Sequence, residues 1–263
     1  MGLVKKKGLT CSVLIGNAHH IGMRDIQQDS FCISDLSDVE LCASKGIFAA
    51  VADGMGGMAD GDKASIIASR TMMQYFNEVA STGRPELDLL SMVIAANENV
   101  NRFMTGTEQG GSTVAAVNIR NDSFYWIAVG DSRICLVRGG AIIQINREHI
   151  YATDLDEMAA RGELSWESAA ADSKRTALTS YLGLKSIEKI DRNLYPAQLI
   201  NGDRILLMSD GIFNTLNDKE ILSTMSLSPQ KSAAGLMEMT LGKQNPNQDN
   251  LTVVILEYKS THK

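Results

Sequence analysis

Four aspartates, each at or beside the end of an apolar run, are the residues whose types and positions suggest chemistry. They are Asp53, Asp131, Asp210 and Asp249, and each is followed directly by a small or polar residue. Apolar runs bounded by glycine predict buried strands, so the carboxylates would lie at strand ends where little else neutralises them. Such a cluster of negative charge requires cations.

The densest of these motifs is Asp-Gly-Met-Gly-Gly at residues 53–57. Glycine lets the backbone turn sharply after a strand and lets the Gly54 carbonyl approach an ion, while the two oxygens of Asp53 can bridge a pair of hard cations. A tight turn between a strand and a helix is the alternative for this motif taken alone. The pairs at residues 210–211 and 249–250 would likewise be ordinary turns if each stood alone.

Composition excludes several classes of protein. The chain has 263 residues, 44% of them hydrophobic, without internal repeats or a proline-rich linker, so we expect one domain over residues 1–263. A net charge of −6 leaves no basic surface for nucleic acid or an anionic membrane. The four cysteines lack CxxC spacing, which fits reduced thiols. No stretch reaches the roughly 20 apolar residues of a membrane span, and no secretory signal is present. We therefore expect a soluble, cytoplasmic monomer without a membrane segment.

Hydrophobic periodicity predicts strands and helices grouped in blocks. Strands are expected at residues 11–16, 30–34, 46–52, 113–118, 123–129, 134–137, 141–145, 188–194, 204–208 and 251–258. Helices are expected at residues 62–80, 87–106, 154–161, 165–171, 218–225 and 228–241. Because these elements do not alternate singly, the pattern favours an α+β sandwich over a doubly wound α/β sheet.

Six short motifs occur in a fixed order along the chain. They are Arg-Asp-Ile-Gln-Gln-Asp at 24–29, Val-Ala-Asp-Gly-Met-Gly-Gly at 51–57, Gly-Ser-Thr at 111–113, Val-Gly-Asp-Ser-Arg at 129–133, Leu-Met-Ser-Asp-Gly at 207–211 and Asp-Asn-Leu-Thr-Val-Val at 249–254. Together they resemble the successive motifs of the metal-dependent protein phosphatase family, of the protein phosphatase 2C type, over about residues 12–258. The Gly-Gly pair resembles the bacterial branch. The resemblance implies a four-layer α-β-β-α sandwich with two central antiparallel sheets and a metal site at one end.

The resemblance also implies a reaction. Asp53 would bridge two Mn²⁺ or Mg²⁺ ions, Gly54 would offer its carbonyl to one, and Asp210 and Asp249 would complete the other. A water or hydroxide between the ions would attack a phosphoserine or phosphothreonine ester in line, as in other two-metal hydrolases. The implied protein is a phosphoprotein phosphatase, with a phosphorylated protein as substrate and a serine/threonine kinase or its targets as candidate partners. No covalent phosphoenzyme is needed, and the sequence lacks a CxxxxxR signature.

Three further residues receive roles from the resemblance. Arg24 stands where the family binds phosphate, and a guanidinium can hold two phosphate oxygens. Its alternative is a surface ion pair, for instance with Asp25. Asp29 matches an acidic residue beside the metal waters, and Asp131 matches a ligand of a third, weaker ion. Asp131 could instead only cap the turn before Arg133.

Departures from the family pattern support a second hypothesis. Gln28 stands where an acid is usual, Met58 replaces a histidine of bacterial members, and Asn146 replaces a threonine. These changes motivate the alternative of a pseudophosphatase, a phosphoprotein-binding module with weak turnover. Met55 stands where animal members of the family have a histidine that is proposed as the general acid. Metal-bound water would then protonate the leaving group. His149 is expected to be structural.

Residues 150–174 correspond to the flap of the family, a subdomain beside the active site that contributes to substrate choice. A surface excursion without a catalytic part is the alternative, and the sequence does not separate the two.

Overall fold

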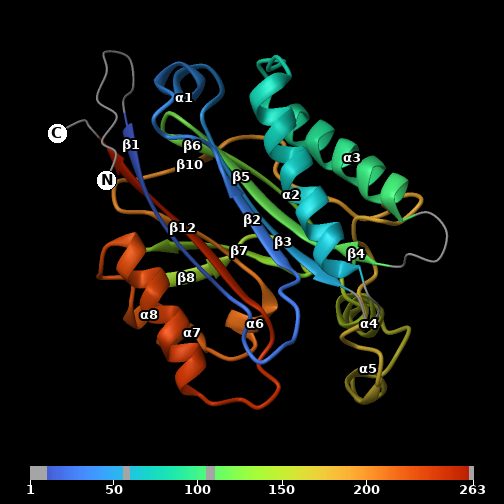
Figure 1. Ribbon diagram of the computed structural model, residues 1–263. Helices are drawn as coiled ribbons and strands as arrows, with labels where there is room; N and C mark the ends of the chain where they lie inside the picture. The colour runs from blue at the N-terminus through green and yellow to red at the C-terminus, as the bar shows by residue number, and fades with distance from the viewer. Residues whose placement is uncertain (1–10, 56–59, 105–109, 261–263) are drawn as a thin grey trace.

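The computed structural model describes residues 11–55, 60–104 and 110–260, and its elements form four layers (Figure 1). Two antiparallel sheets pack face to face in the centre. Helices α2 (Gly61–Glu78) and α3 (Pro85–Phe103) cover one sheet, and helix α8 (Pro229–Gly242) covers the other. The predicted four-layer α+β sandwich is confirmed. The predicted glycine turn at 56–57, Met58 and the end of the second predicted helix at 106 lie outside the described residues.

The first sheet pairs the two ends of the chain. Its strands, in order, are β1 (Cys11–His20), β12 (Leu251–Ser260), β11 (Arg204–Met208), β7 (Arg133–Arg138) and β8 (Ala141–Gln144). His20 lies opposite Leu251 in the register of β1 with β12. The segment that follows β1 therefore lies beside the segment that precedes β12, which brings residues 21–28 to Asp249.

The second sheet brings two acidic residues opposite each other. Its strands, in order, are β10 (Ala197–Gln198), β6 (Ser123–Val129), β5 (Val114–Arg120), β3 (Ile47–Met55) and β2 (Asp29–Ile33), with β4 (Gly111–Ser112) on β3 and β9 (Asp191–Arg192) on β6. Asp29 and Asp53 are directly opposed in the register of β2 with β3. Directly opposed side chains in an antiparallel pair lie on the same face and close together.

Three apolar layers separate the four structural layers. Leu207 of β11 points into the core between the two sheets, whereas its neighbour Leu206 points into the core under the helices of the first sheet. The third core lies between the second sheet and α2 and α3, where Phe48 stacks on Phe76 with ring centroids 5.2 Å apart. Because successive strand residues face opposite layers, strands buried on both sides read as continuous apolar runs.

The remaining helices are short. They are α1 (Val39–Lys45), α4 (Tyr151–Ala160), α5 (Trp166–Ala171), α6 (Asp210–Phe213) and α7 (Asp218–Ser223). Helices α4 and α5 lie beyond the end of the sandwich and share a small core of their own, built on Leu155, Ala159 and Ala169 (Figure 1). In the described ranges, no helix has the length and apolar character needed to cross a membrane.

One expectation about secondary structure was wrong, and two short helices had not been expected. Of the strand expected at 188–194, only the two residues of β9 pair with a neighbouring strand. Beyond them, the Asn193 side chain replaces backbone pairing with β6, because its Oδ1 accepts from the Trp126 amide and its Nδ2 donates to the Phe124 carbonyl. Helices α1 and α6 were not expected. Seven and four residues are too few to display helical periodicity.

The packing of α8 on β1 makes a testable prediction about stability. A Cβ atom on Gly16 would lie 2.1 Å from the backbone carbon of Pro229, at the start of α8. We expect Gly16→Ala to lower the free energy of unfolding by about 1–3 kcal/mol, because backbone cannot move aside as a side-chain end can. Gly242→Ala is the control, since no atom lies within 4 Å of its new Cβ. Urea unfolding measures both, and equal midpoints would contradict this account of the contact.

Candidate metal centre

Asp29 links the two sheets through its buried carboxylate. The residue is 4% exposed, and its Oδ2 accepts from the hydroxyls of Ser209 at 2.7 Å and Thr252 at 2.6 Å, both from the other sheet or its edge. Its Oδ1 is buried and has no hydrogen-bond partner among the described residues. Because buried polar oxygens in folded proteins are nearly always satisfied, this oxygen is suited to a ligand that supplies positive charge.

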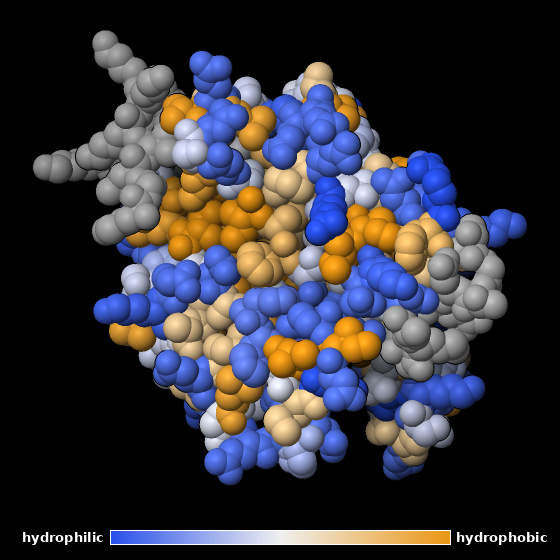
Figure 2. Space-filling model, viewed as in Figure 1, coloured by the Kyte–Doolittle hydropathy of each residue, from blue (hydrophilic) through white to orange (hydrophobic). Residues whose placement is uncertain are grey.

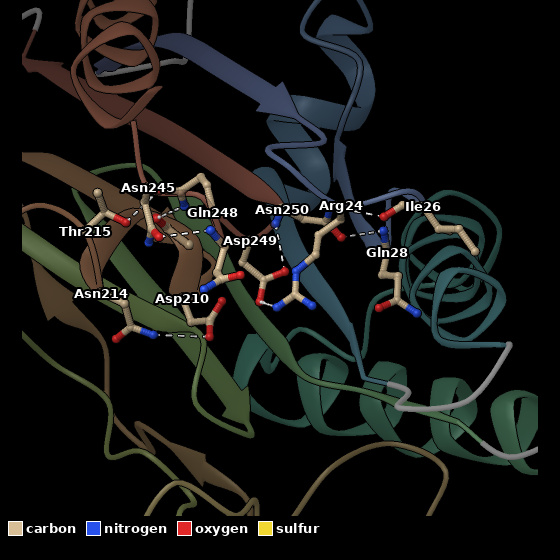
Figure 3. Close-up of polar contacts among 12 residues, drawn as sticks. Arg24, Ile26, Gln28, Asp210, Asn214, Thr215, Asn245, Gln248, Asp249 and Asn250 are labelled. Atoms are coloured by element: carbon tan, nitrogen blue, oxygen red, sulfur yellow. Dashed lines mark hydrogen bonds and ion pairs between the residues drawn. The ribbon is translucent and has the colours of Figure 1, made fainter. Parts of the chain in front are cut away.

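Asp210 and Asp249 lie side by side beneath the same end of the sandwich (Figure 3). Asp210 begins α6 directly after β11, and its Oδ2 accepts from Asn214 Nδ2 at 3.2 Å. Asp249 precedes β12, and its Oδ2 lies 2.7 Å from a guanidinium nitrogen of Arg24. Arg24 therefore pairs with a residue 225 positions away in sequence, and not with Asp25, which the ion-pair alternative for Arg24 had named as an example.

The carboxyl groups act on one another electrostatically. Burial raises the pKa of Asp53 well above its usual value, and the charges of Asp29, Asp210, Asp131 and Asp249 raise it further. Burial, reinforced by the neighbouring acids, raises the pKa of Asp210 to about 7. Burial likewise raises the pKa of Asp29 to about 6, although its hydroxyl donors oppose the shift. The structure thus brings Asp29, Asp53 and Asp210 into one poorly solvated region, where their ionised forms need cations, with the more exposed Asp249 at its rim.

Asp131 stands at the turn between β6 and β7. Burial raises its pKa to about 6, and the nearby charge of Glu148 raises it further. The turn is held by His149, which is buried and whose Nδ1 accepts from the Gly130 amide at 3.1 Å. Burial lowers the pKa of His149, in keeping with a neutral imidazole that accepts a hydrogen bond. His149 is thus a structural residue, as expected, and it helps to fix the position of Asp131.

The donor set fits hard divalent cations. All its side-chain donors are carboxylate oxygens, which suit Mg²⁺ and Mn²⁺. Within the described part of the chain, no three acidic, histidine or cysteine side chains meet closely enough to hold an ion as they stand. Like charges repel, so a cation is required to draw these carboxylates together. Gly54 is essential to the backbone here, since a Cβ would lie 2.1 Å from the Gly61 carbonyl oxygen.

One buried amide, Asn250, holds the segment that carries Arg24, and sequence reasoning missed its role. Its Nδ2 donates to the carbonyls of Ile21 at 2.8 Å and Ile26 at 3.1 Å, and its Oδ1 accepts from the Gln28 amide at 2.7 Å (Figure 3). The only signal in the sequence is an asparagine directly after Asp249. Three backbone bonds from one buried side chain fix the turn that presents Arg24.

Hydroxyl groups position Asp53, and sequence reasoning missed these as well. Thr113 Oγ1 accepts from the Asp53 amide at 3.1 Å and lies 2.7 Å from Ser132 Oγ, which belongs to the turn that bears Asp131. The Thr113 amide donates to the Asp53 carbonyl at 2.8 Å. Thr113 and Ser132 therefore connect the backbone of Asp53 to the turn that bears Asp131, and both do so through neutral groups.

Comparisons with known proteins point to one family. A family model described as protein phosphatase 2C matches residues 17–244. A serine/threonine phosphatase, stp, of Listeria monocytogenes is 26% identical over 220 residues, which are 81% of this chain and 85% of that protein. The serine/threonine protein phosphatase PstP of Mycobacterium tuberculosis is 28% identical over 79% of this chain, and the match spans 40% of that longer protein.

A solved structure has the same fold. The PPM Ser-Thr phosphatase MsPP of Mycobacterium smegmatis, crystallised in complex with cacodylate, superposes with a TM-score of 0.73 and 27% sequence identity. The superposition covers 92% of this chain and 97% of that one. The shared architecture thus includes nearly the whole of both chains.

The role of Asn250 can be tested by removing its donors alone. Asn250→Asp keeps the oxygen that accepts from Gln28 but loses both bonds to carbonyls. We expect the free energy of unfolding to fall by about 1–3 kcal/mol and the Met23 amide, in the turn that loses these bonds, to exchange hydrogen faster, while the Gln28 amide keeps its acceptor. Asn247→Asp adds the same charge at an exposed position of the same segment and serves as control. Unchanged exchange at Met23 would contradict the assigned role.

Cation binding can be tested by thermal unfolding. We expect Mn²⁺ or Mg²⁺ to stabilise the protein by about 2.7 kcal/mol when the free ion is at 100 times its Kd. Asp53→Asn removes a carboxylate that is predicted to bind the ions and should lose most of this gain. Without divalent ions the same variant should melt above wild type, because it relieves repulsion within the cluster. Asp122→Asn, at an exposed turn, is the control. An equal metal-induced rise in Asp53→Asn would rule Asp53 out as a ligand.

Proposed function

The chain belongs to the protein phosphatase 2C family, and on that premise we propose that it is a metal-dependent serine/threonine protein phosphatase. The observation that carries the proposal is the group of poorly solvated, mutually repelling carboxylates at one end of the sandwich, with Asp249 and Arg24 paired beside it. This arrangement suits a dianionic phosphate ester, because cations and a guanidinium together offset its charge. The substrates are phosphoserine and phosphothreonine residues of proteins.

The proposed ligands of two Mn²⁺ or Mg²⁺ ions are Asp53, the Gly54 carbonyl, Asp210 and Asp249. Asp29 stands behind them as a buried acid that supports the site, and Asp131 is assigned to a third, weaker ion. When bound, paired divalent ions neutralise phosphate charge and activate water for in-line attack. The assignment is supported by the desolvation of Asp29, Asp53, Asp131 and Asp210, and by the charge of Asp249, which raises the pKa of both Asp53 and Asp210.

Arg24 binds and orients the phosphate in this proposal. Its side chain is 55% exposed and contacts Asp249 through one terminal nitrogen at 2.7 Å, so the remaining N–H donors of the guanidinium are left for substrate. A planar guanidinium fixed in this way can hold two phosphate oxygens in a defined orientation. The backbone bonds of Asn250 keep the Arg24 turn in place, which lowers the entropy lost on binding.

Leaving-group protonation falls to water in this site. Met55, the last residue of β3, carries no proton, and Met58 lies outside the described residues. His149 is committed to the Gly130 amide through its Nδ1. The site therefore differs from family members in which a histidine is the proposed acid.

The pseudophosphatase alternative rests on Gln28, Met58 and Asn146, and two of these residues have structural roles. The Gln28 carbonyl accepts from the Gly54 amide at 3.0 Å, a bond that does not depend on its side chain. Asn146 Oδ1 accepts from the Ile134 amide at 2.7 Å, and its Nδ2 donates to the Ser132 carbonyl at 3.0 Å. Because these departures leave the proposed ligands intact, the active enzyme is favoured.

Residues 150–174 are proposed to act as the substrate-selecting flap. Helix α4 is tied to the body through Asp154, whose carboxylate accepts from Lys189 at 2.5 Å, and through the ion pair of Glu157 with Arg147. Such exposed or half-exposed pairs are weak and salt-sensitive, which suits a segment that moves when substrate binds.

A serine/threonine kinase or its targets are the proposed partners.

Turnover of 4-nitrophenyl phosphate with Mn²⁺, followed by excess chelator, tests the function. We expect a rate that chelator abolishes and that Asp53→Asn lowers by about 100-fold or more. Asp131→Asn should lower kcat by about tenfold while retaining the main metal-induced thermal stabilisation, because it is assigned to the third ion. Asp122→Asn again serves as the control. A rate indifferent to chelator would reject the enzyme, whereas full activity in Asp53→Asn would reject only the site assignment.

A further inference from the structure

The turn between β1 and β2 presents three large apolar side chains to solvent around Arg24. Ile21, Met23 and Ile26 are 37%, 66% and 50% exposed. Figure 2 shows apolar surface over this turn, set among hydrophilic side chains. Exposed apolar residues scattered singly need no explanation, but three within six residues around a proposed phosphate ligand indicate a contact surface.

The backbone of this turn is fixed, so the exposure is a property of the fold. Asn250 binds the carbonyls of Ile21 and Ile26, and the Met23 amide donates to the Gln248 carbonyl at 2.9 Å. Gln248 is itself buried and donates through Nε2 to the Gly211 carbonyl at 3.0 Å, next to Asp210. The hydrogen bonds of Gln248 and Asn250 therefore fix both the backbone next to Asp210 and the backbone of the turn that bears the apolar side chains.

The apolar side chains of Ile21, Met23 and Ile26 lie beside Arg24, and this position indicates that a bound phosphopeptide would contact them. A phosphate held by Arg24 places the phosphorylated residue directly above the turn, and an extended peptide advances about 3.3–3.6 Å per residue. The residues next to the phosphorylated one therefore come within reach of Met23, just before Arg24, and of Ile26, two residues after it. Apolar flanking side chains gain from leaving water there, and the flexible thioether of Met23 adapts to different shapes.

Resting on the proposed function, we propose that Met23 and Ile26 form a substrate-reading surface that favours phosphorylated serine or threonine flanked by large apolar residues. Their contact with substrate is separate from the phosphate contact made by Arg24. Loss of the surface should therefore change the choice among phosphoproteins and leave the chemistry at phosphate in place.

Two phosphothreonine peptides that differ only in their flanking residues, leucine in one and glutamine in the other, test this proposal on the full chain with Mn²⁺. We expect kcat/KM of wild type to be about fivefold higher for the leucine peptide, the scale expected for partial burial of such side chains. In Met23→Gln/Ile26→Gln the ratio should fall to about 1. Ile143→Gln is the matched control, because Ile143 is 52% exposed on β8, at the opposite edge of the first sheet from β1.

Each outcome bears on one hypothesis. A wild-type ratio of 1 or below overturns the reading surface without any variant, and so does a double variant that keeps the fivefold ratio. A fall of the ratio in Ile143→Gln would also overturn it, because the effect would not be local to the turn. Failure of the proposed function is seen separately, as a lack of Mn²⁺-dependent hydrolysis of 4-nitrophenyl phosphate by wild type.

Discussion

Repulsion among buried carboxylates is the constraint on which the rest of this structure depends. Burial and the charges of its acidic neighbours both raise the pKa of Asp53, so the folded chain without cations is driven to hold protons there. The sandwich resists this repulsion because these carboxylates lie on strands of the two sheets or on segments directly attached to them, and the sheets are fixed by the core between them. Asp29, bonded to hydroxyls of Ser209 and Thr252, joins the sheets at the site itself.

The supporting groups around the cluster are mostly neutral, for a physical reason. The amide of Asn250, the hydroxyl of Thr113 and the neutral ring of His149 position backbone without adding charge. An extra carboxylate would strengthen the repulsion, and an extra ammonium would compete with the cations for the acids. Arg24 is the cation that pairs with Asp249, and its half-exposed guanidinium retains donors for substrate.

Because the supporting network is shared, the acidic site and the turn at residues 21–28 are coupled. Gln248, Asp249 and Asn250 are consecutive, and they contact the α6 start, Arg24 and the turn at residues 21–28 respectively. Substitutions in this tripeptide should therefore change metal affinity and phosphate binding together. By contrast, Met23 and Ile26 contact solvent on the outer side of the same turn, where sequence can vary with little effect on the acids.

The sequence by itself determined the sandwich, most of its strands and helices, and the acidic residues, because long apolar runs and strand-end aspartates are local patterns. The strand expected at 188–194 failed because Asn193 bonds to strand residues nearly 70 positions away, which no local pattern encodes. The partner of Arg24 and the role of Asn250 were likewise decided only by the tertiary structure, since their contacts span 225 and 229 residues. The acidic residues could be named from the chain alone. Their mutual repulsion in a poorly solvated region, and hence the strength of their demand for cations, arises only when the two sheets bring them together.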